Sequence, residues 1–215
     1  MRKLIVNTFV SLDGVMQAPG GPEEDPTGGF ALGGWAVNYF DEEMMARMLP
    51  AGYELLLGRG TYEIFAAHWP YAEGPIADHL NSTRKYVAST TLEKVEWNNA
   101  VLIPGDVPEY VANLKQEDKP EIQVHGSPGL LQTLLRHGVI DEFRTWIFPV
   151  LVGGGKRLFG DGTTPAALEL VESVPSNTGV TINIYRPAGA VEIGSMEFEE
   201  PTEAEVARRG RIAEQ

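Results

Sequence analysis

Three short segments combine glycine with hydroxyl or basic side chains, and each follows an apolar run typical of a β-strand. They are 58–61 (GRGT), 89–91 (STT) and 126–129 (GSPG). Glycine lets an anionic group approach the backbone closely, and free N–H groups at a helix start bind phosphate. Because the carboxyl ends of parallel strands lie on one edge of a sheet, the segments are predicted to converge on one phosphorylated ligand. Each segment alone is more often an ordinary strand-to-helix loop, so the prediction depends on their convergence.

None of these segments matches a standard nucleotide-binding fingerprint. A Rossmann G-x-G-x-x-G motif would need glycine where Glu63 stands, and a Walker loop would need other residues at Val150 and Arg157. The absence of cysteine excludes thiolate nucleophiles, disulfides and cysteine-ligated metals. The four histidines lack metal-ligand spacing, so no metal site is predicted, and no Gly-x-Ser-x-Gly motif supports a serine hydrolase.

Alternating strands and helices must position these segments. Strands are predicted at 3–10, 54–58, 84–89, 100–103, 121–125, 143–149, 168–171 and 180–185. Helices are predicted at 39–49, from about Thr61, from Asp106, at 127–138 and at 202–213. This order predicts an α/β fold with a mostly parallel sheet covered on both faces and an antiparallel edge formed by the late strands.

The stretch 12–34, which follows the first strand, is rich in glycine and proline and shows neither helical nor strand periodicity. Loops of that length inside a domain are usually functional, and the aromatic residues near the end of this one favour a role as a lid that covers a binding site. Trp35 and Phe40 are candidates to stack on a planar substrate, with core packing as the alternative.

The composition restricts the partners of the chain. With 17 Lys and Arg against 30 Asp and Glu, the formal charge of −13 disfavours nucleic acid as a partner. No apolar run approaches the roughly 20 residues that span a bilayer, and the N-terminus does not resemble a signal peptide. We therefore expect a soluble, cytoplasmic protein with a small-molecule ligand and no membrane partner. Residues 1–190 are predicted to form one domain, and 191–215 a loosely docked tail of strand and helix.

Five motifs in a fixed order resemble a known family. They are 12–15 (LDGV), 57–62 (LGRGTY), 87–90 (VAST), 124–127 (VHGS) and 149–155 (PVLVGGG). Their order is similar to that of the dihydrofolate reductase-like superfamily, and the first and last motifs look most like the reductase domain of the bacterial riboflavin-biosynthesis deaminase-reductase. The resemblance spans about residues 3–186. It implies a three-layer α/β/α domain around a mixed, mostly parallel sheet, and an NADPH site in a homodimer. The antiparallel edge with Trp146 is one candidate dimer surface, and burial of Trp146 is the alternative.

The resemblance also implies roles for individual residues. Those that match the family's cofactor-binding positions are Gly58, Arg59, Thr61, Ser89, Thr90, Gly126, Ser127, Leu130, Gly153 and Gly154. The turn at 58–61 receives cofactor phosphates, Ser89 and Thr90 meet the adenosine 2′-phosphate, and the turn at 126–130 lies beneath the pyrophosphate. Ser127 departs from the Gly-Gly pair usual at that turn. Gly153 and Gly154 fall near the nicotinamide.

Two acids are the candidate catalytic residues. Asp13 follows the first strand and is placed to anchor polar substrate atoms, and Asp41, with Glu42 beside it, lies where folate reductases place their acid. A turn-forming role for Asp13 and a helix-end role for the other two are the alternatives. The predicted function is an NADPH-dependent reductase that passes a hydride to a small heterocyclic or carbonyl-type substrate, pterin-, pyrimidine- or riboflavin-precursor-like. The alternative is a nucleotide-binding regulatory module without turnover.

Overall fold

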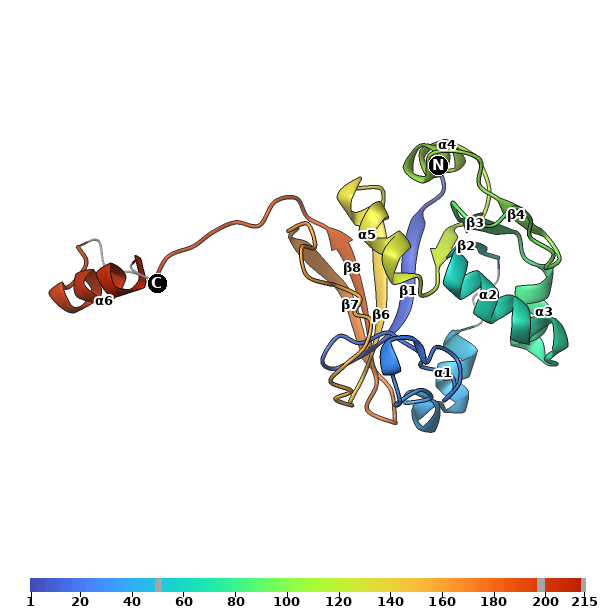
Figure 1. Ribbon diagram of the computed structural model, residues 1–215, viewed down its shortest axis with the longest axis horizontal. Helices are drawn as coiled ribbons and strands as arrows, with labels where there is room; N and C mark the ends of the chain where they lie inside the picture. The colour runs from blue at the N-terminus through green and yellow to red at the C-terminus, as the bar shows by residue number, and fades with distance from the viewer. Residues whose placement is uncertain (49–51, 197–199, 214–215) are drawn as a thin grey trace.

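The computed structural model describes residues 1–48, 52–196 and 200–213, and its centre is an eight-stranded mixed sheet (Figure 1). The strands are β1 (Leu4–Ser11), β2 (Glu54–Gly58), β3 (Lys85–Ala88), β4 (Ala100–Leu102), β5 (Ile122–Val124), β6 (Glu142–Phe148), β7 (Leu168–Pro175) and β8 (Thr181–Pro187). The helices are α1 (Glu42–Arg47), α2 (Arg59–His68), α3 (Pro75–Ser82), α4 (Val107–Leu114), α5 (Pro128–Arg136) and α6 (Glu203–Ala213). Three short 3-10 turns are η1 (Thr27–Gly29), η2 (Val37–Tyr39) and η3 (Trp69–Tyr71).

The sheet has the strand order β4-β3-β2-β5-β1-β6-β8-β7. All pairings from β4 to β6 are parallel, whereas β8 pairs antiparallel with β6 and β7 antiparallel with β8. The mixed, mostly parallel sheet with an antiparallel edge is therefore confirmed. The carboxyl ends of β1 to β6 all lie on one side, which we call the carboxyl edge.

Helices cover both faces of the sheet. On one face, Leu4 and Val6 of β1 pack with Val111 of α4 and Leu131 of α5. On the other face, apolar residues of β2 and β3 pack against α2 and α3, and a separate aromatic cluster surrounds Phe148. Parallel strands buried on both faces explain the continuous apolar runs in the sequence, such as ELLLG at β2.

Several boundaries differ from the predicted ones. Helix α2 begins at Arg59 rather than near Thr61, because the chain turns helical directly after Gly58. Helix α3 was not predicted; it buries only Ala77 and Leu80, so its apolar pattern is weak. Strand β7 continues to Pro175, four residues past its predicted end. Helix α1 is shorter than the predicted 39–49, and the predicted stop at Pro50 lies outside the described residues.

Trp146 lies inside the domain. Its side chain is buried, and its indole N–H donates to Asn7 Oδ1 over 2.8 Å. Trp146 is therefore not available as a dimer surface; the outermost strand of the antiparallel edge is β7, which exposes Leu168, Leu170 and Val171.

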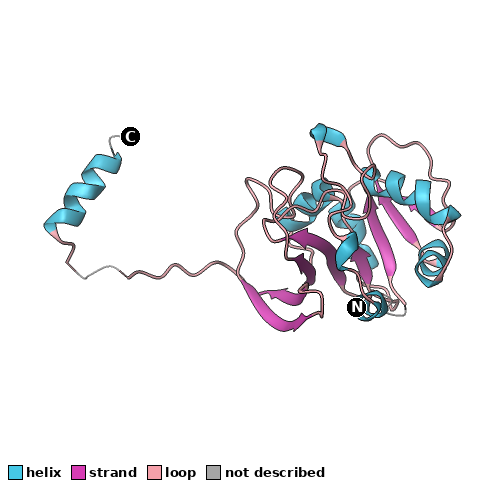
Figure 2. Cartoon of the chain, turned by 90° about the horizontal axis from the view of Figure 1, so that it is seen from below, coloured by secondary structure: helices cyan, strands magenta, loops and turns pink. Residues whose placement is uncertain are grey.

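The chain beyond β8 extends away from the sheet and ends in α6 (Figures 1 and 2). Ile193 and Met196 are almost fully exposed, and no residue of α6 is buried. None of the helices in the described part of the chain is long and apolar enough to cross a membrane.

We expect truncation after Ala190 to leave the domain intact. Because the described residues 191–196 and α6 bury no side chain, removal of 191–215 should change the free energy of unfolding by less than about 0.5 kcal/mol. Urea unfolding of the full and truncated chains measures this directly. A loss of more than about 1 kcal/mol would place the tail inside the folding unit.

Candidate active site

The loops that follow β2 and β5 are joined by the side chain of Ser127. Its hydroxyl accepts the backbone N–H of Gly58 over 2.8 Å and donates to Thr61 Oγ1 over 2.9 Å. Ser127 is the N-cap residue of α5, but its backbone is left-handed (φ +65°), and its hydroxyl makes no capping bond. The hydroxyl instead ties two neighbouring strand ends together.

The loop after β3 joins the same cluster through Arg59. The Arg59 guanidinium donates to Thr91 Oγ1 over 2.8 Å and lies 3.6 Å from a Glu63 carboxylate oxygen. Ser89 Oγ accepts the backbone N–H groups of Thr91 and Leu92, which fixes the turn and presents hydroxyls to solvent. The structure thus brings 58–61, 89–91 and 126–129 together at the carboxyl edge, and we call these segments the three strand-end loops.

Close backbone packing explains the glycines of these loops. A Cβ on Gly126 (φ +66°) would lie 3.2 Å from Thr61 Oγ1, and a Cβ on Gly58 would lie 3.2 Å from Ser127 Oγ and 3.5 Å from Leu130 Cβ. A left-handed backbone costs an ordinary residue about 1–2 kcal/mol, which Ser127 offsets in part through its two hydrogen bonds.

Replacing Gly126 and Gly129 with alanine should change stability in opposite directions. Gly126→Ala combines a positive φ with the contact to Thr61, so it should lower the free energy of unfolding by about 1–2 kcal/mol. Gly129 lies in the first turn of α5 with nothing within 4 Å of an added Cβ, so Gly129→Ala should be neutral or stabilise by up to about 1 kcal/mol. Urea unfolding of both variants tests the pair, and equal losses would contradict the assigned turn.

Asp13 connects β1 to the segment after β6. Its carboxylate accepts the Ser11 hydroxyl over 2.6 Å and the backbone N–H groups of Val152 (3.0 Å) and Gly153 (2.7 Å). These bonds, that from Ser11 first, lower the pKa of Asp13 to about 2. The group is therefore an anion at neutral pH with no proton to give. Its bonds favour a positioning role, since they hold Gly153 in place.

Asp41 has a structural task as well. It is the N-cap of α1, and its Oδ1 accepts the backbone N–H of Met44 over 2.8 Å. Trp35 and Phe40 both make edge contacts with Phe148, at 5.4 and 6.1 Å between ring centroids, as the core-packing alternative requires. Catalytic roles for Asp13 and Asp41 stay predictions.

The stretch 12–34, the lid, folds over the segment 150–157. Gln17 is buried and makes three hydrogen bonds: its amide N–H groups donate to the carbonyls of Asp25 and Thr27, and its carbonyl accepts the backbone N–H of Lys156. Lys156 Nζ in turn reaches the Asp25 carboxylate over 2.6 Å. The sequence did not point to the two contacts of Lys156, because its partners lie more than 130 positions away along the chain.

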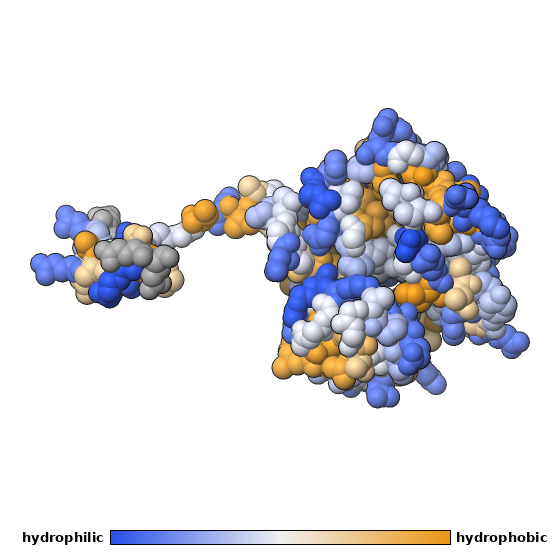
Figure 3. Space-filling view, in the orientation of Figure 1, coloured by the Kyte–Doolittle hydropathy of each residue, from blue (hydrophilic) through white to orange (hydrophobic). Residues whose placement is uncertain are grey.

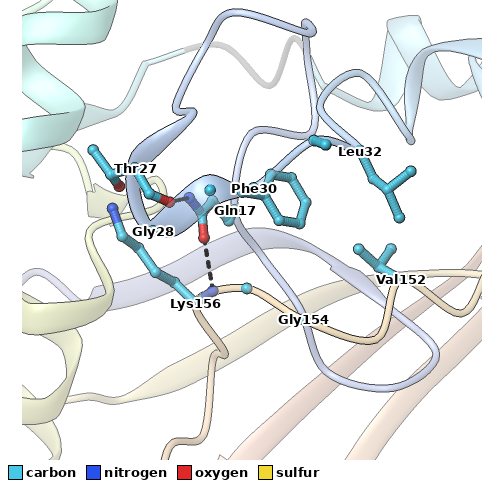
Figure 4. Close-up of a pocket in the computed structure, with 11 residues that line it drawn as sticks. Gln17, Thr27, Gly28, Phe30, Leu32, Val152, Gly154 and Lys156 are labelled. Atoms are coloured by element: carbon cyan, nitrogen blue, oxygen red, sulfur yellow. Dashed lines mark hydrogen bonds between the residues drawn. The ribbon is translucent and has the colours of Figure 1, made fainter.

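Between the lid and this segment lies a pocket of about 500 Å³ (Figure 4). Phe30 and Leu32 of the lid face Val152, Gly154 and Lys156 of the segment across it. The pocket therefore lies where the lid from β1 meets the chain leaving β6, beside Gly153. Within the described ranges, no cluster of His, Asp or Glu has the arrangement of a metal site.

The sequence of the chain matches a known protein family and an uncharacterized relative. The family model of the RibD C-terminal domain matches residues 2–182. The uncharacterized protein YyaP of Bacillus subtilis (strain 168) is 28% identical over 193 residues, covering 86% of this chain and 94% of the relative.

Two solved structures share the fold. A putative riboflavin biosynthesis protein from Shewanella sp. PV-4 has a TM-score of 0.63 at 22% identity, covering 86% of this chain and 99% of the other. Dihydrofolate reductase from Enterococcus faecalis, solved with NADP(H), has a TM-score of 0.56 at 14% identity, covering 86% and 96%. The expected dihydrofolate reductase-like fold is confirmed.

Proposed function

The chain belongs to the RibD C-terminal domain family, and from this premise we propose that it is an NADPH-dependent reductase acting on a small heterocyclic or carbonyl-type substrate. The observation that carries the proposal is the convergence of the three strand-end loops at the carboxyl edge, joined by hydrogen bonds of Ser127 and Arg59. One ligand with several phosphates can contact all three loops at once.

The residues of these loops fit NADPH. The half-exposed Arg59 guanidinium and the hydroxyls of Ser89, Thr90 and Thr91 supply the donors that a 2′-phosphate needs. Gly129 has nothing within 4 Å of an added Cβ, so it leaves the backbone open at the start of α5, where a pyrophosphate would bind. When bound, the cofactor supplies the hydride, and the protein supplies binding, orientation and exclusion of water.

The sheet order gives this cofactor a direction. From β3 to β6 there are four strand spacings, about 19 Å, along which β2, β5 and β1 follow in turn. The 2′-phosphate end would lie at β3 and the reacting end at β1 and β6, beside Gly153, Gly154 and the lid pocket. Asp13 then acts as a positioning residue, since it holds Gly153 through the backbone.

Titration with NADPH, followed by assays of NADPH oxidation with pterin, pyrimidine and quinone substrates, tests the proposal. Tight binding with turnover is the expected result. Tight binding without turnover across the panel would favour a regulatory nucleotide-binding module. No affinity for pyridine nucleotides would overturn both.

A cytoplasmic location and a homodimer remain parts of this proposal. The apolar side chains exposed on β7 support the dimer, and sedimentation of the purified chain measures it.

A further inference from the structure

The lid pocket has a mostly uncharged lining. Phe30, Leu32 and Val152 contribute apolar side chains, and the remaining wall includes backbone of glycines from both segments. Leu12 and Leu151 lie where the lid leaves β1 and the segment leaves β6, with 65% and 75% of their surface exposed. Figure 3 shows hydrophobic surface at the lower part of the body, where the lid and this segment lie.

The polar side chains of the pocket are already paired. Gln17 uses its amide on two carbonyls and one backbone N–H. Lys156 is the single cation among the described lining residues, and its ammonium is neutralised by Asp25. Although desolvation opposes ionisation, hydrogen bonds from Lys156 and Thr27 lower the pKa of Asp25, so the partner stays charged at neutral pH.

The next cation along the chain is engaged as well. Arg157 donates to the carbonyls of Asp13 and Gly153 and lies 3.9 Å from the Asp13 carboxylate. To contact a cation in the pocket, a phosphate would have to break the ion pair of Lys156 or the bonds of Arg157, and it would have to approach a chain with a formal charge of −13. A flat apolar molecule would leave these bonds intact, and its burial against Phe30 and Leu32 would favour binding.

We propose that the lid pocket binds an uncharged, flat, apolar molecule, such as a quinone or an unphosphorylated heterocycle, and discriminates against phosphorylated ones. This deepens the proposed function, on which it rests, by assigning the substrate class of the same site. The Asp25–Lys156 ion pair determines the specificity of the pocket, because it neutralises the positive charge that would otherwise attract an anion.

Calorimetric titration of the full chain with naphthoquinone and with its ring sulfonate tests the assignment without turnover. The two probes differ by one negative charge, and a chain without cysteine offers no thiol for quinone addition. Wild-type protein should bind the neutral quinone at least about tenfold more tightly than the sulfonate. Equal binding of both probes, or no binding of the neutral one, would overturn the assignment.

Variants test which residues cause the discrimination between the quinone and its sulfonate. Asp25→Asn frees the Lys156 ammonium, so it should improve sulfonate affinity about tenfold and leave quinone affinity unchanged. Glu23→Gln removes an equal charge from an exposed lid position and should change neither. Leu32→Asp should weaken both probes, because it replaces an apolar wall of the pocket with a carboxylate that also repels the sulfonate. If Asp25→Asn improves the sulfonate no more than Glu23→Gln does, the pair is not the determinant.

A separate NADPH titration of the same sample keeps the two proposals apart. Loss of NADPH affinity refutes the reductase, whereas NADPH binding with indifference between the two quinones refutes only the substrate class.

Discussion

Replacing Arg59 with alanine is expected to raise the dissociation constant of NADPH by about 5- to 150-fold and to change that of NADH much less. A 2′-phosphate carries close to two negative charges, and a charge-assisted contact to it is worth about 1–3 kcal/mol. The Arg59 guanidinium already lies beside the hydroxyls of the loop after β3, held by Thr91 at 2.8 Å, with half of its side chain exposed to receive a ligand. Fluorescence titration with both nucleotides measures the selectivity.

Two neighbours serve as controls for this effect. Glu63→Gln removes the carboxylate 3.6 Å from Arg59 while keeping the guanidinium, so NADPH affinity should stay the same or increase. Thr91→Val removes the hydroxyl that orients Arg59 and should weaken NADPH less than Arg59→Ala does. If Arg59→Ala lowered the affinities for NADPH and NADH equally, Arg59 would form only a surface ion pair and would not bind the 2′-phosphate.

Local sequence patterns predicted the parts of the site that depend on strand ends. Glycines and hydroxyls after apolar runs indicated all three strand-end loops, because a tight turn directly after a strand favours these residues. The strand and helix alternation then predicted the parallel sheet that sets these loops side by side. The positions of strands, of helices and of the turn residues that follow them can be predicted from the spacing of residue types along the sequence.

Contacts between distant segments were beyond such patterns. Asp13 was identified as a catalytic candidate, but its partners Val152 and Gly153 depend on β1 and β6 being neighbours, which no local spacing reveals. The Asp25–Lys156 pair has the same origin. Thr91, rather than Thr90, meets Arg59 because the turn made by Ser89 points it there. Side-chain direction in a turn follows from backbone geometry and not from residue type.

Acid should weaken this fold through His125, the residue just before the left-handed turn at Gly126. Burial, aided by the nearby His79, lowers the pKa of His125 from 6.5 to about 4. The unfolded chain therefore takes up a proton between these two values and the folded chain does not. The free energy of unfolding should fall as pH decreases from about 6.5 to about 4, by at most about 3 kcal/mol, and this contribution should level off below pH 4.

His125→Gln isolates this contribution from the carboxylates, which titrate in both proteins. Glutamine keeps a donor toward Gln123 Oε1, which accepts from His125 Nε2 over 2.8 Å, but binds no proton. Urea unfolding at several pH values should show a shallower loss for the variant. Because Gly126 follows directly, NADPH affinity should fall with stability at low pH in the wild-type chain and less in the variant. Parallel stability curves for the two proteins would mean that His125 keeps an ordinary pKa, and the turn at Gly126, the proposed pyrophosphate site, would then be independent of pH.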